Sequence, residues 1–204
     1  MEDTTTFKRT KFGEFMYKIS VESGLFVARR KWLFYLLSYT WGLLTTIAGW
    51  VILGFVSIFM RKTTVEKGKF FTARYIIFGN NWGGLECGTN FLVAGHMGDH
   101  YTTHSKCHEY GHTCQSAVFG PFVLFLFYIP SICRYWYHRI RAKKNLPNTP
   151  YDLPYFEASA TKIGETILSQ KEGKDYFYYT DGLMTKNKNY GNVIEGYHET
   201  DNTK

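Results

Sequence analysis

Residues 108–112 read His-Glu-Tyr-Gly-His, two histidines four positions apart with a glutamate directly after the first. Residues four apart on a helix lie on the same face, so the imidazoles of His108 and His112 could bind one metal ion. Zinc accepts imidazole nitrogen at about 2.0–2.1 Å and lowers the pKa of a bound water toward 7. Glu109 could take the proton of that water without being a ligand. The pattern therefore predicts hydrolysis by a zinc-activated water.

The motif alone is suggestive, because two incidental histidines on a solvated helix would give the same pattern. Two features beside it favour metal binding. Gly111 costs a helix roughly 1 kcal/mol relative to alanine, and a residue this small would let another backbone approach closely. The motif also leads into an apolar stretch at 121–133, where unligated histidines would be partly buried without partners.

A catalytic zinc site keeps three protein ligands and one open position, so a third ligand must come from elsewhere in the chain. The candidates are Glu157, Asp152, His138 and His100. Glu157 is preferred because it lies early in a helix-like stretch, and a second helix that crosses the first could present its carboxylate to the metal. The alternative is an ordinary acidic residue at a helix N-terminus, where the helix dipole stabilises it.

The motif followed by a later E-x-x-A resembles the gluzincin class of zinc metallopeptidases, whose membrane-bound members carry H-E-x-x-H beside transmembrane segments. The string at 108–116 is also similar to a group of small microbial membrane proteins with H-E-x-G-H-x-x-Q-S. The resemblance covers residues 82–165 and implies a zinc ion with one catalytic base. It implies that the ligands are His108, His112 and Glu157 and that the base is Glu109.

The same resemblance implies that the strand-like stretch at 85–93 is an edge strand on which an extended peptide pairs. One position departs from the gluzincin pattern. Many gluzincins have an aspartate four residues after the ligand glutamate, where it supports a zinc histidine, and here that position is Thr161. Thr161 could accept a hydrogen bond but carries no charge, so it would support a zinc histidine less strongly than an aspartate.

An oxyanion-stabilising residue is also expected, because peptide hydrolysis develops negative charge on the carbonyl oxygen. The sequence leaves four candidates open: Tyr151, Tyr155, His104 and His138.

Two helices must position these residues. The sequence predicts one helix over 105–119, ended by Gly120-Pro121, and another over 155–170 that Pro154 opens. His112 precedes the apolar stretch and Glu157 follows it. They can share a metal only if residues 105–137 form a helical hairpin that dips into the membrane, where surrounding protein must shield any irregular backbone.

The remaining chain suggests a membrane anchor and a small sheet. Residues 32–60 contain no charged side chain and exceed the roughly 20 residues needed to cross hydrocarbon, which predicts a transmembrane helix. Residues 12–28 fit an amphipathic helix, either on the membrane or packed on the domain. Strand-like runs at 69–78 and 91–93, with a turn at 79–84 between them, predict a small antiparallel sheet.

The expected fold is thus an α+β membrane protein. Its predicted parts are a polar N-terminal segment (1–31), a transmembrane helix (32–60), a zincin-like domain (61–170) and a polar tail (171–204). The mean hydropathy of −0.25 argues against a transporter with many spans. Cys107 and Cys114 would be about 10 Å apart on a helix, too far for a disulfide between them.

The net charge of +7 comes from basic clusters beside the apolar segments, at 29–31, 61–62 and 139–144. This placement suits an anionic membrane surface better than nucleic acid, and it favours an active site near the cytoplasmic face, although the clusters do not fix orientation. The sequence therefore predicts a membrane-associated zinc endopeptidase that acts on peptides or membrane-protein segments. The alternatives are a non-catalytic zinc-binding membrane scaffold and a membrane-tethered nucleic-acid binder.

Overall fold

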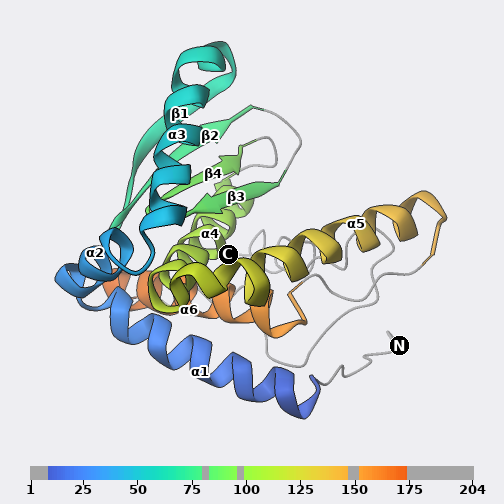
Figure 1. The fold of residues 1–204 in the computed structure, drawn as a ribbon. Coiled ribbons are helices and arrows are strands. Elements are labelled where there is room, and N and C mark those ends of the chain that lie inside the picture. Colours follow the sequence, from blue (N-terminus) through green and yellow to red (C-terminus); the bar gives the residue numbers. More distant parts are fainter. Residues whose placement is uncertain (1–8, 80–82, 96–98, 147–151, 174–204) are drawn as a thin grey trace.

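A computed structural model describes residues 9–79, 83–95, 99–146 and 152–173. This part of the chain forms six α-helices and one four-stranded sheet, which confirms the predicted α+β class (Figure 1). The helices are α1 (Lys11–Ala28), α2 (Lys31–Tyr39), α3 (Leu43–Phe59), α4 (Asp99–Phe119), α5 (Ile129–Lys143) and α6 (Tyr155–Glu172). The strands are β1 (Thr64–Phe70), β2 (Ala73–Phe78), β3 (Gly84–Cys87) and β4 (Asn90–Ala94). The predicted polar tail lies outside the described residues from 174 onward.

The sheet has the order β1-β2-β4-β3 and is mixed, which corrects the predicted antiparallel sheet. β1 with β2 and β3 with β4 are antiparallel, but β2 and β4 run parallel, with Tyr75 opposite Phe91. The predicted strands at 69–78 and 91–93 do contain paired residues, but the prediction of a hairpin between them failed because it missed the strand β3 that lies between them in sequence. Strand β3 pairs with β4 through a tight turn at Gly88, whose φ of +64° suits glycine.

The charge-free stretch at 32–60 is not one helix, which corrects the predicted single transmembrane helix. α2 and α3 meet at a bend of 91°. The bend packs against α4, because a Cβ at Gly42 would lie 3.2 Å from the carbonyl oxygen of Ser116. The Thr46 hydroxyl then donates to the carbonyl of Ser38 across the bend, at 2.8 Å.

Among the described residues, no single helix is both long and apolar enough to cross a membrane. Two bent pairs satisfy the length and composition test together: α2 with α3, and residues 102–122 with 124–143. The second pair contains the predicted reversal after the histidine motif. It bends by 119° through Gly120, whose φ is +52°, and a π-helical turn at Leu124–Tyr128, so the reversal is wider than a tight hairpin.

Helices α4 and α6 cross at a close backbone contact made by two glycines. A Cβ on Gly111 would lie 1.9 Å from the carbonyl oxygen of Ala160, and one on Gly164 would lie 1.9 Å from that of Cys107. The close approach expected at Gly111 is therefore confirmed. Both helices occur where the sequence predicted them, although α4 begins earlier, at Asp99, and α6 ends at a left-handed Gly173.

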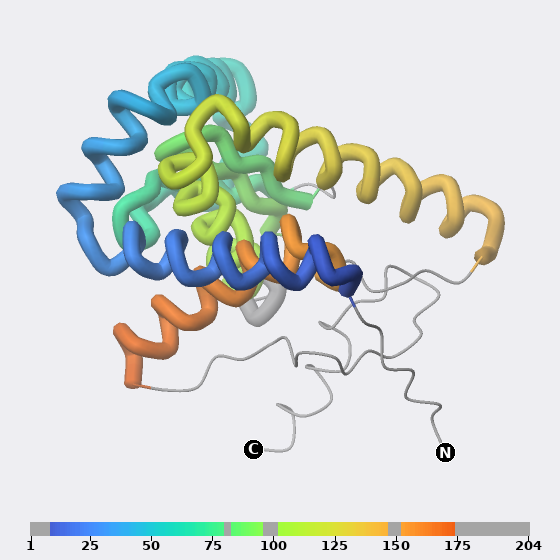
Figure 2. Tube along the Cα trace, turned by 60° about the horizontal axis from the view of Figure 1, so that its bottom comes forward, coloured from blue at the N-terminus to red at the C-terminus, as the bar shows by residue number. Residues whose placement is uncertain are grey.

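Helix α1 lies across α4 and α6 (Figure 2). Its inner face is buried, and Gly24 meets the side chain of Ile163 on α6. One core cluster joins residues from α1, α2, β2, β4, α4 and α6, among them Val27, Phe34, Val93 and Tyr110. The N-terminal helices therefore share a core with the sheet and with the helices that carry the histidine motif.

Candidate metal centre

The histidines of α4 and the glutamate of α6 converge where the two helices cross. The Nε2 atoms of His108 and His112 are 3.2 Å apart. Oε2 of Glu157 lies 3.1 Å from the first and 3.4 Å from the second. In the described part of the chain, these residues form the group whose ligand atoms lie close enough together to hold a metal ion. The structure thus brings together the three predicted ligands.

The three separations can be compared with those around a bound ion. Ligand atoms at about 2.0–2.1 Å from a tetrahedral metal are separated from one another by about 3.3 Å. The observed values of 3.1, 3.2 and 3.4 Å lie close to that edge length. The spacing therefore fits one face of a tetrahedron, which would leave a fourth position for water or substrate.

The second histidine is oriented by a side-chain amide. Nδ1 of His112 lies 2.7 Å from Oε1 of Gln115, one turn further along α4. The amide nitrogen of Gln115 donates to Ser159 at 2.8 Å and to Ser20 at 3.2 Å, which leaves its oxygen as the acceptor facing the ring. Nδ1 of His112 must then carry the proton, so its Nε2 presents a lone pair to the metal position.

The first histidine is oriented by a hydroxyl. Nδ1 of His108 lies 2.8 Å from Oγ1 of Thr161, and that hydroxyl donates to Oδ2 of Asp152 at 3.1 Å. The hydroxyl has one proton, which it gives to the carboxylate, so toward the ring it accepts. His108 therefore also has a proton on Nδ1, which leaves Nε2 as the ring atom directed at Glu157 and the metal position.

With both rings neutral, three electron pairs would face one another at this point, an arrangement that a cation between them would stabilise. Glu157 is fully buried, and no hydroxyl, amide or backbone N–H among the described residues donates to either of its carboxylate oxygens. A buried carboxylate without a donor is costly unless it meets positive charge. These residues fit a divalent metal ion.

The electrostatics of the metal-free pocket agree with this conclusion. Burial alone would lower the pKa of His108, but contact with Glu157 and the nearby carboxylates of Asp152 and Glu109 raise that pKa to about 10. Burial opposes ionisation of Glu157, yet both imidazoles hold its pKa well below the ordinary value. Without a metal the pocket retains a proton as its cation, which a metal ion would displace.

Glu109 lies between α4 and the edge strand β3. A Cβ at Gly84 would come within 2.0 Å of its Oε1, so the carboxylate rests against the bare backbone of that strand. Burial raises the pKa of Glu109; the two histidines of the motif lower it, and Glu157 raises it further. A buried carboxylate with a raised pKa, next to the metal ligands, is suited to accept a proton near neutral pH.

The other candidates occupy different positions. Asp152 lies behind His108 and is not in the ligand group. His104 faces Asp152 and Glu165, at 3.8 and 3.6 Å. The Tyr155 hydroxyl donates to the carbonyl of Leu126 at 2.7 Å and is thereby held by the backbone.

His138 is buried on α5, where burial and the charges of Arg134 and Arg141 lower its pKa to about 4, against the opposing charge of Glu157. It is therefore neutral at neutral pH. The side chain of His100 and all of Tyr151 lie outside the described part of the chain.

Sequence reasoning missed another buried carboxyl near the site, that of Glu86. Glu86 on β3 accepts from Ser116 of α4 at 2.9 Å and from Tyr128 of the π-helical turn at 2.5 Å. Burial raises its pKa to about 8, although Tyr128, the charge of His112 and Ser116 each lower it. One local signal concerned its partner. Ser116 follows His112 by four positions, and Gln115 by three, so both lie next to that ring on a helix.

Comparison of this chain with known protein families, with characterised proteins and with solved structures finds no match.

Proposed function

We propose that the protein is a membrane-associated, zinc-dependent endopeptidase. The observation that carries the proposal is the convergence of His108 Nε2, His112 Nε2 and Glu157 Oε2 at tetrahedral spacing. Two histidines and one glutamate are a ligand set of catalytic zinc sites in peptidases, where the remaining position holds water. Among common metals, zinc best suits imidazole ligands in a tetrahedral arrangement.

The chemistry divides between the ion and the chain. Bound zinc would act as a Lewis acid toward a water molecule and the substrate carbonyl. Glu109 takes the proton of that water and returns it to the amide nitrogen that leaves, so each cleavage consumes one water. His138, which is buried and neutral at pH 7, stays a candidate for stabilising the oxyanion.

The edge strand supplies a place for an extended peptide. β3 is the last strand of the sheet, and Gly84 and Leu85 on it are exposed. Only the first part of the predicted edge at 85–93 has this position, because β4 lies inside the sheet. A substrate added beside β3 would form main-chain hydrogen bonds and bring its backbone close to Glu109.

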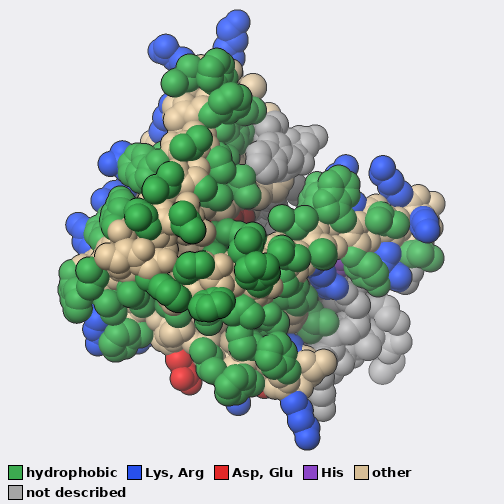
Figure 3. Space-filling view, viewed as in Figure 1, with side chains coloured by type: hydrophobic (Ala, Val, Ile, Leu, Met, Phe, Trp, Pro, Cys, Tyr) green, Lys and Arg blue, Asp and Glu red, His purple; other side chains and the backbone are tan. Residues whose placement is uncertain are grey.

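The membrane part of the proposal rests on exposed apolar side chains. On α3, Leu44, Val51, Phe55 and Ile58 follow one another at helical spacing and are 72%, 66%, 56% and 71% exposed. Figure 3 shows apolar side chains over much of one face of the molecule, with lysine and arginine at its margins. A soluble monomer rarely exposes a patch of this extent.

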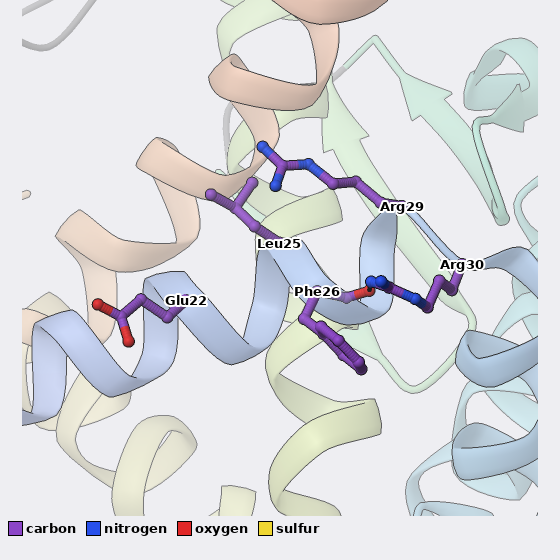
Figure 4. A pocket seen from close by; sticks show the side chains of 5 residues that line it. All are labelled: Glu22, Leu25, Phe26, Arg29 and Arg30. Atoms are coloured by element: carbon purple, nitrogen blue, oxygen red, sulfur yellow. Dashed lines mark hydrogen bonds between the residues drawn. The ribbon is translucent and has the colours of Figure 1, made fainter.

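We propose that this apolar face rests in the interface of an anionic bilayer, on its cytoplasmic side. Basic residues follow α3 (Arg61) and end α5 (Lys143), where phosphate headgroups would meet them. A shallow cavity of about 530 Å³ also lies at the end of α1, where Figure 4 shows Arg29 and Arg30 beside apolar side chains of that helix. Apolar and basic surfaces together fit lipid better than a protein partner.

Vesicle sedimentation tests this surface. Wild-type protein should bind vesicles containing phosphatidylserine more strongly than vesicles of phosphatidylcholine alone. Leu44→Glu combined with Ile58→Glu should abolish binding, because each places a charge on the exposed face of α3. Leu44→Ile combined with Ile58→Leu keeps the same two positions apolar, is the matched control and should bind as wild type. Wild-type protein that stays in solution with both vesicles would refute the membrane proposal.

Catalysis is tested by metal content and peptide cleavage on the same preparations. Wild type should hold one zinc per chain and cleave members of a peptide library. Glu109→Gln should keep the zinc and lose cleavage, since the amide cannot accept the proton. Glu22→Gln, an exposed glutamate on α1, is the matched control and should be fully active. Stoichiometric zinc without cleavage in wild type would favour the alternative function, a non-catalytic zinc-binding scaffold.

A further inference from the structure

We propose that Asp152 is a positioning residue for the metal centre and acts on His108 through the hydroxyl of Thr161. This inference rests on the proposed metal site. The observation behind it is a continuous chain of hydrogen bonds: His108 Nδ1 to Thr161 Oγ1 at 2.8 Å, and Thr161 Oγ1 to Asp152 Oδ2 at 3.1 Å. Thr161 is fully buried and Asp152 is 7% exposed, so water does not screen the chain.

Proton counting gives the chain a direction. The carboxylate of Asp152 can only accept, so the single hydroxyl proton of Thr161 points toward it. The lone pairs of that oxygen then accept the Nδ1 proton of His108. The negative charge of Asp152 polarises the hydroxyl, and the hydroxyl makes the imidazole a more basic ligand. A carboxylate one hydrogen bond beyond Thr161 thus strengthens the support for His108 that a neutral threonine alone would give only weakly.

His104 lies on a second side of Asp152. Nε2 of His104 lies 3.8 Å from the same Oδ2 atom, and Nδ1 of His104 lies 3.6 Å from Oε1 of Glu165 on α6. The two zinc histidines are therefore supported differently. His112 is held by the neutral amide of Gln115, whereas His108 is held by a hydroxyl backed by a carboxylate.

Zinc affinity, measured by competition with a chromogenic chelator, tests the relay without reference to catalysis. Asp152→Asn and Thr161→Val should each weaken zinc binding by about 10–100-fold, the usual cost of losing such a partner. Combining Thr161→Asp with Asp152→Asn should recover most of the loss, because a carboxylate then accepts directly from His108. Glu22→Gln should not change the affinity. Denaturant unfolding of each metal-free variant shows whether it is folded, and zinc affinities are compared only among the folded variants.

Several results would overturn the relay. Wild-type affinity in Asp152→Asn, with a loss in Thr161→Val, would show that the hydroxyl acts alone. A loss in Asp152→Asn that the Thr161→Asp change does not recover would show a steric role instead of a charge. Both results leave the proposed zinc site intact. Wild-type protein that binds no zinc would overturn the relay together with the proposed function.

Discussion

Gly111→Ala tests whether the crossing of α4 and α6 builds the metal centre. A Cβ at this position would lie 1.9 Å from the carbonyl oxygen of Ala160, whereas ordinary contact begins at 3.4 Å. The obstacle is backbone and cannot rotate aside, so the close-packed helices must separate locally by about 1.5 Å. That displacement falls between His108 and His112 on one helix and Glu157 on the other.

The site cannot absorb such a movement. Its Nε2 to Oε2 separations are 3.1 and 3.4 Å, and a working constellation must be held to within about 0.5 Å. We expect cleavage to fall by at least about 100-fold and zinc to dissociate during dialysis. Overpacking should also lower the free energy of unfolding by about 1–3 kcal/mol, partly offset by the gain of roughly 1 kcal/mol in helix propensity.

Gly54→Ala is the matched control, because nothing lies within 4 Å of the position a Cβ would take there on α3. This variant should keep its zinc and gain up to about 1 kcal/mol of stability. Zinc per chain and denaturant unfolding in mild detergent are measured for both variants. If Gly111→Ala retained wild-type affinity and an unchanged unfolding midpoint, the two backbones would not meet at this residue, and the account of how Glu157 reaches the histidines would be wrong.

Two further predictions concern the histidines. Zinc affinity should rise with pH up to about 10, because the metal displaces a proton from His108, whose pKa is raised to about 10. The same raised pKa stabilises the metal-free protein below pH 6.5, and this stability is lost as the pH rises to about 10. Between these pH values the free energy of unfolding of the metal-free protein should therefore fall while its zinc affinity rises. If both quantities rose or both fell, the assignment to His108 would be refuted. Gln115→Leu should weaken zinc binding by about 10–100-fold in a titration, since it removes the acceptor for His112 Nδ1, whereas Gln170→Leu near the end of α6 should not.

The convergence of the three candidate ligands could be predicted from the sequence because most of the required information is local. His108 and His112 face the same way on any helix, and the sequence predicted a helix over 105–119 that contains both. Gly111 indicated a close neighbour for the same reason, since its cost in a helix needs a packing explanation. Glu157 was harder, but its place in the first turn of a helix limited where its carboxylate could point.

The path of the backbone could not be predicted, because it depends on contacts between distant residues. The stretch at 32–60 has the composition of one membrane span, yet Gly42 packs against the carbonyl of Ser116 and the chain turns there. The composition of this stretch shows how long its apolar run is, but it does not show where the backbone changes direction. The parallel pairing of β2 with β4 is equally non-local, since it requires β3 to pair on the far side of β4.

The role of Asp152 shows the same limit within the site. In sequence it is one of several candidate ligands, and Thr161 reads as the loss of a supporting carboxylate. The structure places the carboxylate one hydrogen bond further away, in a segment that precedes α6. A substitution at one position and its compensation at another can be linked only once the fold brings them together.

The carboxyl group of Glu86 connects the parts of the molecule that the proposed function needs. It lies on the edge strand, two residues after the Gly84 backbone that contacts the catalytic base, and it is bonded to Ser116 of α4 and Tyr128 of the π-helical turn. Phe125 on the same turn is 66% exposed. With a pKa of about 8, this carboxyl is mostly protonated at neutral pH, so the junction is held by hydrogen bonds without a buried charge. The strand proposed to bind substrate, the helix proposed to hold the metal and the π-helical turn therefore meet at one buried contact, so a change at Glu86 should disturb all three elements together.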